Sequence, residues 1–169
     1  MRILSLLLIG LLSGCMGMPD GVTPVNHFDS ERYLGTWYEV ARLDHSFERG
    51  LEQVSAEYQP REDGGIRVIN RGVDAESGEA KAAEGKAYFV NDEQEAYLKV
   101  SFFGPFYGSY VVFELDDDYQ HAFVSGYNHD YLWLLARDPV ISPELKARFV
   151  IQAKERGFDT DGLIWVKQQ

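Results

Sequence analysis

Short segments in which apolar and polar residues alternate recur through most of the chain, separated by turn-forming residues. Alternation with a period of two is typical of strands that bury one face. The pattern predicts about eight strands, near residues 36–43, 54–58, 66–70, 83–89, 96–102, 110–115, 121–127 and 131–137. Short turns such as Glu62-Asp63-Gly64-Gly65 connect consecutive segments, so we expect an all-β antiparallel meander.

A helical pattern follows the strands. Ser142 is an N-cap candidate, Pro143 suits the first helical position, and Gly157 suits the C-cap. Between them one apolar stripe is formed by Leu145, Phe149, Val150 and Ala153. Residues 163–166 read as a final short strand, and residues 29–34 as a single helical turn before the first strand. We therefore expect one amphipathic C-terminal helix beside the sheet.

The block from Gly35 to Arg42, Gly-Thr-Trp-Tyr-Glu-Val-Ala-Arg, is the most specific motif in the chain. It resembles the first conserved region of the lipocalins, most closely that of the bacterial outer-membrane members related to apolipoprotein D. The resemblance implies an eight-stranded up-and-down β-barrel, or calyx, with one C-terminal α-helix packed outside. The second lipocalin motif is matched by Asp118 and Tyr119, and the third by Arg137, although Ala122 stands where many relatives have a second Tyr.

Counting strands from Gly35 and Trp37 places these three motifs at the same end of the meander. Arg137 on the indole face of Trp37 would add a cation–π contact worth roughly 1 kcal/mol and keep donors for backbone carbonyls. We therefore predict that Gly35, Trp37, Asp118, Tyr119 and Arg137 close one end of the barrel.

The N-terminal residues resemble a bacterial lipoprotein signal. Residues 1–14 combine a basic start with an apolar run too short to span a bilayer. Leu12-Ser13-Gly14-Cys15 resembles the lipobox, which implies acylation of Cys15, and Met16 in the next position implies delivery to the outer membrane. The alternative is a plain secretory signal with an incidental cysteine. Residues 15–26 are expected to form an acylated tether and residues 27–169 the barrel domain, with the fold starting near Phe28.

Charge and cysteine content restrict the remaining classes of function. The formal net charge of -11 repels nucleic acid and anionic lipid headgroups, so membrane attachment has to be hydrophobic or covalent. A single cysteine excludes an intramolecular disulfide. The four histidines lack metal-site spacing, so we expect no metal site and no cofactor. No Gly-X-Ser-X-Gly elbow occurs, and we expect no enzymatic activity.

The interior of an eight-stranded barrel either holds one small ligand or is filled by side chains. With Trp37 and Arg137 inward, strand parity predicts that Glu39, Ala41 and Leu43 also point inward. The lining mixes small residues with aromatic ones, which favours a hollow for an acyl chain. The predicted ligand-contacting residues are Tyr58, Phe89, Leu98, Val100, Phe102, Phe106, Tyr107, Tyr110, Tyr131 and Trp133, with Tyr107 as the candidate headgroup contact.

The resemblance to the bacterial lipocalins implies a fatty acid or lysophospholipid as ligand, for storage, transport or repair of envelope lipids. Together with the lipobox-like segment, the resemblance implies a protein that is lipid-anchored to the periplasmic face of the outer membrane. The alternative is an envelope scaffold or assembly partner whose barrel is filled. The shorter ten-stranded fatty-acid-binding type fits less well, because it is not exported and lacks the helix at 143–156. Homodimerisation through exposed aromatics near the open end of the barrel is a further alternative.

Overall fold

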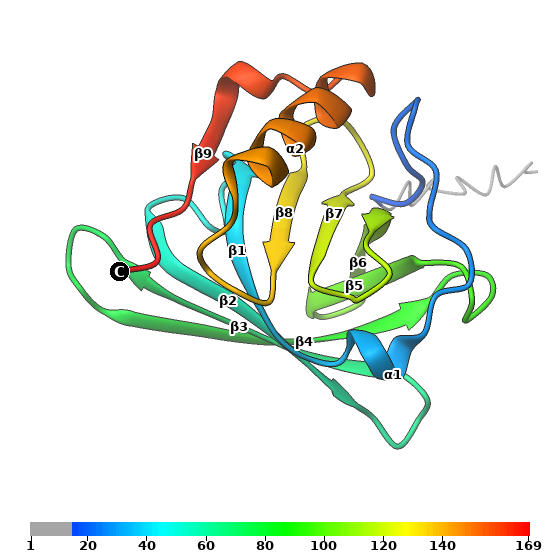
Figure 1. Cartoon of the computed structure of the whole chain (residues 1–169). Coiled ribbons are helices and arrows are strands. Elements are labelled where there is room, and N and C mark those ends of the chain that lie inside the picture. Colours follow the sequence, from blue (N-terminus) through cyan, green and yellow to red (C-terminus); the bar gives the residue numbers. More distant parts are fainter. Residues whose placement is uncertain (1–14) are drawn as a thin grey trace, which may run out of the picture.

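The alternating segments form one antiparallel sheet that closes on itself (Figure 1). The computed structural model describes residues 15–169, so the predicted signal peptide at residues 1–14 lies outside it. The strands are β1 (Gly35–Leu43), β2 (Leu51–Pro60), β3 (Ile66–Asp74), β4 (Ala80–Phe89), β5 (Tyr97–Phe103), β6 (Phe106–Leu115), β7 (His121–Ser125), β8 (Leu132–Ala136) and β9 (Leu163–Trp165). Each strand from β1 to β7 pairs with the next, β8 pairs with β1 and closes the barrel, and β9 pairs with the later part of β1. The predicted eight-stranded up-and-down barrel is thus confirmed.

Two short helical elements flank the strands. Helix α1 (Ser30–Tyr33) precedes β1 and is capped by Asp29, whose carboxylate accepts from the backbone amides of Glu31 and Arg32 at 3.0 and 3.3 Å. A 3₁₀ turn, η1 (Thr160–Gly162), leads into β9. The predicted turn before the first strand and the final short strand are both present.

Helix α2 (Pro143–Glu155) lies across the outside of the barrel, as the C-terminal helix was predicted to do (Figure 1). The hydroxyl of Ser142 caps it by accepting from the Leu145 amide at 3.1 Å. Phe149 and Ala153 are fully buried, and the Phe149 ring meets Phe123 of β7 edge-on with centroids 4.9 Å apart. The molecule therefore has two apolar cores, one inside the barrel and one between the barrel and α2.

The segment before Phe28 is packed against the barrel, which differs from the tether that we expected. Val22 is only 6% exposed, and Met16 and Met18 contact the outer core. The amide of Val25 donates to the carbonyl of Val112, and its own carbonyl accepts from Ala96, at 2.9 and 3.0 Å. The ordered fold thus starts well before Phe28, because apolar side chains in this segment cover the barrel wall.

A β-bulge in β1 overturns one part of the predicted parity. Glu39 pairs with Leu135 and Ala41 with Leu134, so one extra residue, Val40, lies between them. Beyond the bulge the faces are exchanged. Ala41 and Leu43 therefore belong to the outer core under α2, and the prediction that they point inward was wrong.

Residues 166–168 fasten the bulged parts of β1 and β2. The amide of Val166 donates to Val40, and the amide of Gln53 donates to Lys167, at 2.9 and 2.7 Å. The side-chain amide of Gln168 donates to the carbonyls of Glu39 and Val54, at 2.6 and 3.1 Å. Backbone groups that the bulges remove from the strand ladder are in this way supplied with partners.

Candidate ligand-binding site

One end of the barrel is closed by a guanidinium stacked on an indole. The Arg137 guanidinium lies 4.0 Å from the ring centroid of Trp37, which is fully buried. The indole N–H donates to the Tyr33 carbonyl at 2.8 Å. Gly35 has φ of 95°, and a Cβ added to it would lie 3.3 Å from Arg137 Nη1. A residue without a side chain therefore suits the place where the incoming chain passes Arg137.

Arg137 also joins the incoming turn to the end of β8. Its two Nη groups donate to the carbonyls of Thr36, Leu34 and Arg32, each at 2.9 Å, and its Nε donates to the carbonyl of Tyr119 at 3.2 Å. Partial burial lowers the pKa of Arg137 from its ordinary value, yet the group remains cationic at neutral pH. One side chain thus holds two distant segments together.

Tyr119 contributes to this end, whereas the side chain of Asp118 is exposed. Tyr119 has a positive φ of 56°, and its hydroxyl accepts from the Asp29 amide at 2.9 Å. The acid that organises the turn is Asp116, whose carboxylate accepts from the amides of Gln120 and His121, each at 2.7 Å. Sequence reasoning missed Asp116, although an acid that begins a turn between two strands is a usual acceptor for amides further along it.

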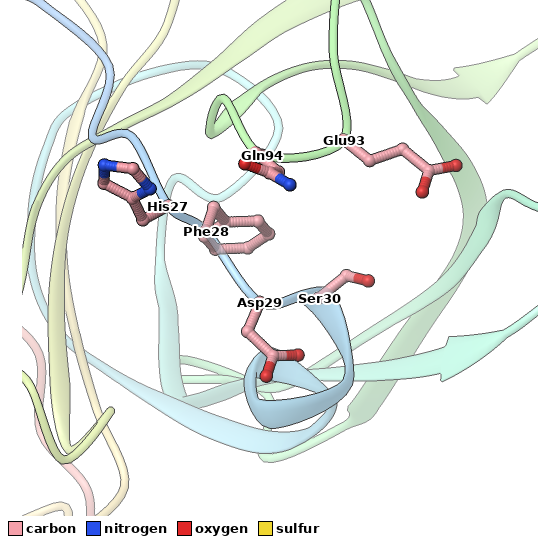
Figure 2. A pocket seen from close by; sticks show the side chains of 6 residues that line it. All are labelled: His27, Phe28, Asp29, Ser30, Glu93 and Gln94. Atoms are coloured by element: carbon pink, nitrogen blue, oxygen red, sulfur yellow. The ribbon is translucent and has the colours of Figure 1, made fainter.

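A shallow depression of about 390 Å³ lies on the outside of this closed end and is lined by His27, Phe28, Asp29, Ser30, Glu93 and Gln94 (Figure 2). The Phe28 ring, only 5% exposed, separates the depression from the interior and packs against Tyr33 at 5.1 Å. The depression is therefore the outer side of the barrel floor.

Three tyrosines fill the interior just above this floor. The Tyr110 hydroxyl is hydrogen-bonded to the hydroxyls of Tyr33 and Tyr58, at 2.7 and 2.8 Å. Burial raises the pKa of all three phenols, so they are neutral at physiological pH and act as donors and acceptors. Leu98 is buried at this level as well. Of the predicted ligand contacts, Tyr58 and Leu98 thus belong to the packed lower part.

The upper interior is lined by small side chains that solvent reaches. The inward positions at this level are partly exposed, and they include Ala56, Asn70, Gly85, Val100 and Gly108. The β4–β5 ladder runs only from Lys86 to Phe89, so the part of β4 above it has no ladder pairing with β5 among the described residues. The barrel therefore has a packed base, and the inward positions above it, which we call the upper interior, are partly exposed.

A group of charged residues lies on one wall of the upper interior. Arg42, turned inward by the bulge and 2% exposed, donates to the Glu39 carboxylate at 2.9 Å. Its Nη2 also donates to the carbonyls of Glu48 and Leu51, at 2.8 and 3.2 Å. Burial, with a smaller contribution from nearby Glu48, raises the pKa of Glu39. The interior thus contains the Arg42 guanidinium, although strict alternation along β1 would put Arg42 on the outer face of the barrel.

Trp133 links this charged group to the aromatic residues of the rim. Its indole N–H donates to the Glu48 carboxylate at 3.0 Å, and the same carboxylate lies 2.7 Å from His45 Nε2. Burial alone would raise the pKa of Glu48, but the contacts from His45 and Trp133 lower it overall. Trp133 also stacks on Tyr131 at 6.2 Å, and Tyr131 on Phe47 at 6.2 Å.

The remaining predicted contacts are divided between the mouth and the outer surface. Phe102 lies against Gly85 at the mouth and is 40% exposed, and Phe106 is 64% exposed at the tip of the β5–β6 turn. Phe89 is partly buried low in the inner core. Tyr107 lies on the outer face, with the Lys99 ammonium 4.9 Å from its ring centroid. It does not line the upper interior, because it alternates with the inward residues of β6.

Cys15 lies on the outside of the barrel near the open end. It is exposed, its carbonyl accepts from the Ser109 amide at 2.9 Å, and it forms a parallel bridge with Gly108. None of the helices in the described part of the chain is long and apolar enough to cross a membrane. Within residues 15–169 no cluster of three or more His, Cys, Asp or Glu side chains is arranged to hold a metal ion.

Comparisons with known proteins agree with this architecture. A family model described as a lipocalin-like domain matches residues 28–168. The chain is 63% identical over 171 residues to the outer membrane lipoprotein Blc of Vibrio cholerae serotype O1, with all of both chains covered. It is 56% identical to the protein of that name from Escherichia coli K12, covering 89% of this chain and 85% of that one. Insecticyanin of Manduca sexta has the same fold, with a TM-score of 0.70 at 22% identity over 89% and 86% of the two chains.

Proposed function

Because the chain belongs to the lipocalin-like domain family, we propose that it holds one fatty acid or lysophospholipid in the upper interior of its barrel. Binding of a small hydrophobic ligand is the activity that the family implies. The observation that supports this assignment is the upper interior above the packed floor, where small and apolar inward positions such as Ala56 and Val100 are partly exposed. Each buried methylene of an acyl chain contributes about 0.8 kcal/mol, so a long chain can reach micromolar affinity after the costs of binding.

The wall that carries Arg42 and Trp133 supports a ligand with one polar end. An acyl chain would pack against the apolar surface formed by Val100 and Ala56. A headgroup near the rim would form hydrogen bonds with aromatic side chains. Phe102, Phe106, Tyr131 and Trp133 are the proposed contacts at this level, and Tyr110 lies at the base of the upper interior. Tyr107 faces outward and is therefore not one of the proposed ligand contacts.

We also propose that the protein is anchored to the outer membrane through acylated Cys15, facing the periplasm. Relatives that cover most of this chain are named outer membrane lipoproteins, and the lipobox-like Leu12-Ser13-Gly14-Cys15 supports the same attachment. Two or three acyl chains on one residue give stable anchoring, where a single chain is only marginal. Storage, transport or repair of envelope lipids is the proposed role.

Titration with a fluorescent fatty acid tests the proposal. We expect saturation at one ligand per chain and at least tenfold weaker binding after Trp133→Ala. The matched control is Trp165→Ala, because Trp165 packs outside the barrel against Phe149. A filled scaffold, which the packed lower interior favours, would give no saturable binding to the wild-type protein. Native mass spectrometry of protein from its own membrane would independently report acylation and any bound lipid.

A further inference from the structure

The acylation site that we propose has almost no freedom relative to the barrel. Residues 16–26, if extended, would span roughly 35 Å and would let the barrel take any orientation. Instead, the Cys15 carbonyl is bonded to the Ser109 amide, and the Gly17 amide donates to the Tyr97 hydroxyl, each at 2.9 Å. Met16 and Met18 pack on the outer core. An acyl group on Cys15 is therefore held beside the first residues of β6.

The adjacent β5–β6 turn exposes two large apolar side chains. Phe103 is 78% exposed and Phe106 is 64% exposed, and their rings stack with centroids 6.5 Å apart. Phe106 lies two residues before Gly108, which forms the bridge with Cys15. Phe47, 71% exposed, lies in the β1–β2 loop at the same open end. Clustered exposed aromatics of this kind mark a surface that contacts another apolar phase or another protein.

The residues of this turn carry no charge of their own. Residues 100–113 contain no charged side chain, although a quarter of all residues are charged. Arg61, Glu84 and Lys86 line a depression beside Phe102 and Phe103, so insertion places these three side chains at the lipid headgroups, while the turn itself enters the interface without desolvating a charge. Attachment here would depend mainly on apolar contact.

We propose that Phe103 and Phe106 insert into the lipid leaflet that carries the acyl chains of Cys15. The inference rests on the proposed acylation and goes beyond it by fixing which end of the molecule meets the membrane. With this turn inserted, the open end of the barrel faces the bilayer. A lipid then passes between the leaflet and the upper interior without crossing bulk water.

The test uses the full acylated lipoprotein in phosphatidylethanolamine–phosphatidylglycerol vesicles. In Phe103→Cys and, as control, Glu93→Cys, the introduced thiol is the only one that a fluorophore can label, because Cys15 is acylated. Glu93 is exposed in the β4–β5 turn and lines the depression on the outside of the closed end. Lipids carrying a nitroxide on the acyl chain should quench the label at position 103 at least threefold more than the label at position 93.

Equal quenching at the two positions would overturn the inference. Mass spectrometry of the same sample shows whether Cys15 is acylated. If the protein is acylated and quenching is equal at the two positions, the proposed attachment stands and only the proposed orientation is refuted. Concentration-dependent protection of the label at position 103 in the absence of vesicles would instead identify a second copy of the chain as the partner, and would also overturn it.

A functional measurement complements the depth measurement. Phe103→Ser should slow transfer of a fluorescent fatty acid from vesicles to the protein several-fold, while its affinity in solution at equilibrium changes less than twofold, because Phe103 is not among the proposed ligand contacts. Because the Phe103 side chain is 78% exposed, the variant should unfold at the same urea concentration as the wild type. An unchanged transfer rate in this folded variant would refute the proposed insertion.

Discussion

Arg137→Ala should remove the main connection between the incoming turn and the end of β8. The variant loses three hydrogen bonds of 2.9 Å and one of 3.2 Å to backbone carbonyls, together with the contact on Trp37. Since Arg137 is partly exposed, water replaces some of these partners, and each hydrogen bond is worth about 0.5–1 kcal/mol. With about 1 kcal/mol for the cation–π contact, the free energy of unfolding should fall by about 3–5 kcal/mol.

Urea unfolding followed by far-ultraviolet circular dichroism measures this loss without relying on Trp37 fluorescence. Arg156→Ala is the matched control, because its guanidinium lies 5.2 Å from the Phe113 centroid and donates to one carbonyl, that of Gln152. The control should lose about 1 kcal/mol. Arg137→Lys should recover less than half of the loss, since an ammonium cannot reproduce the planar fork. A loss at Arg137→Ala within 1 kcal/mol of the control would refute the reasoning.

Three further predictions concern the interior and the helix. Tyr110→Phe leaves the hydroxyls of Tyr33 and Tyr58 without their shared partner and should lower the free energy of unfolding by about 1–2 kcal/mol in urea denaturation. Because the pKa of Glu39 is raised in the folded protein, the folded state binds its proton more tightly, so stability relative to Glu39→Gln should fall as pH rises above the ordinary value near 4.5. Ser142→Ala should cost about 1 kcal/mol by thermal unfolding, because α2 loses its cap.

Each of these measurements has a control. Tyr88→Phe removes an exposed hydroxyl bonded to Asp63 at 2.8 Å, so a loss as large as that of Tyr110→Phe would contradict the role of burial. Parallel pH profiles for the wild type and Glu39→Gln would show that the pKa of Glu39 is not raised. Restoration by Ser142→Asp separates loss of the cap from a general effect of substitution at this position.

Much of the fold could be predicted from the sequence because alternation, turn residues and the helix cap are local signals. Strand order then placed Gly35, Trp37, Tyr119 and Arg137 at one end, and the structure brings these residues into contact. The side chain of Asp118 is exposed instead, and Asp116 is the residue that accepts the amides of the turn.

The parity of β1 could not be predicted, because Val40 and Ala41 are both apolar and fit either face of the strand. The bulge depends on hydrogen bonds from residues distant in sequence, including the Val166 amide. One signal was present, since an inward Glu39 needs a buried donor and Arg42 is the nearest cation along the chain. The packing of residues 16–26 was not predicted, because the prolines and glycines of this segment are typical of a tether. The apolar Met16, Met18 and Val22 were the signal of burial.

The hydrogen bonds from residues 166–168 to the two bulged strands have a consequence for biosynthesis. Gln168 follows Glu39 by 129 residues, so the first hairpin of the barrel cannot obtain all its partners until residue 168 has left the ribosome. A nascent chain of this kind stays incompletely folded during synthesis. For a chain exported as we propose, this delay keeps the polypeptide competent for passage through a translocon until residues 166–168 have been added.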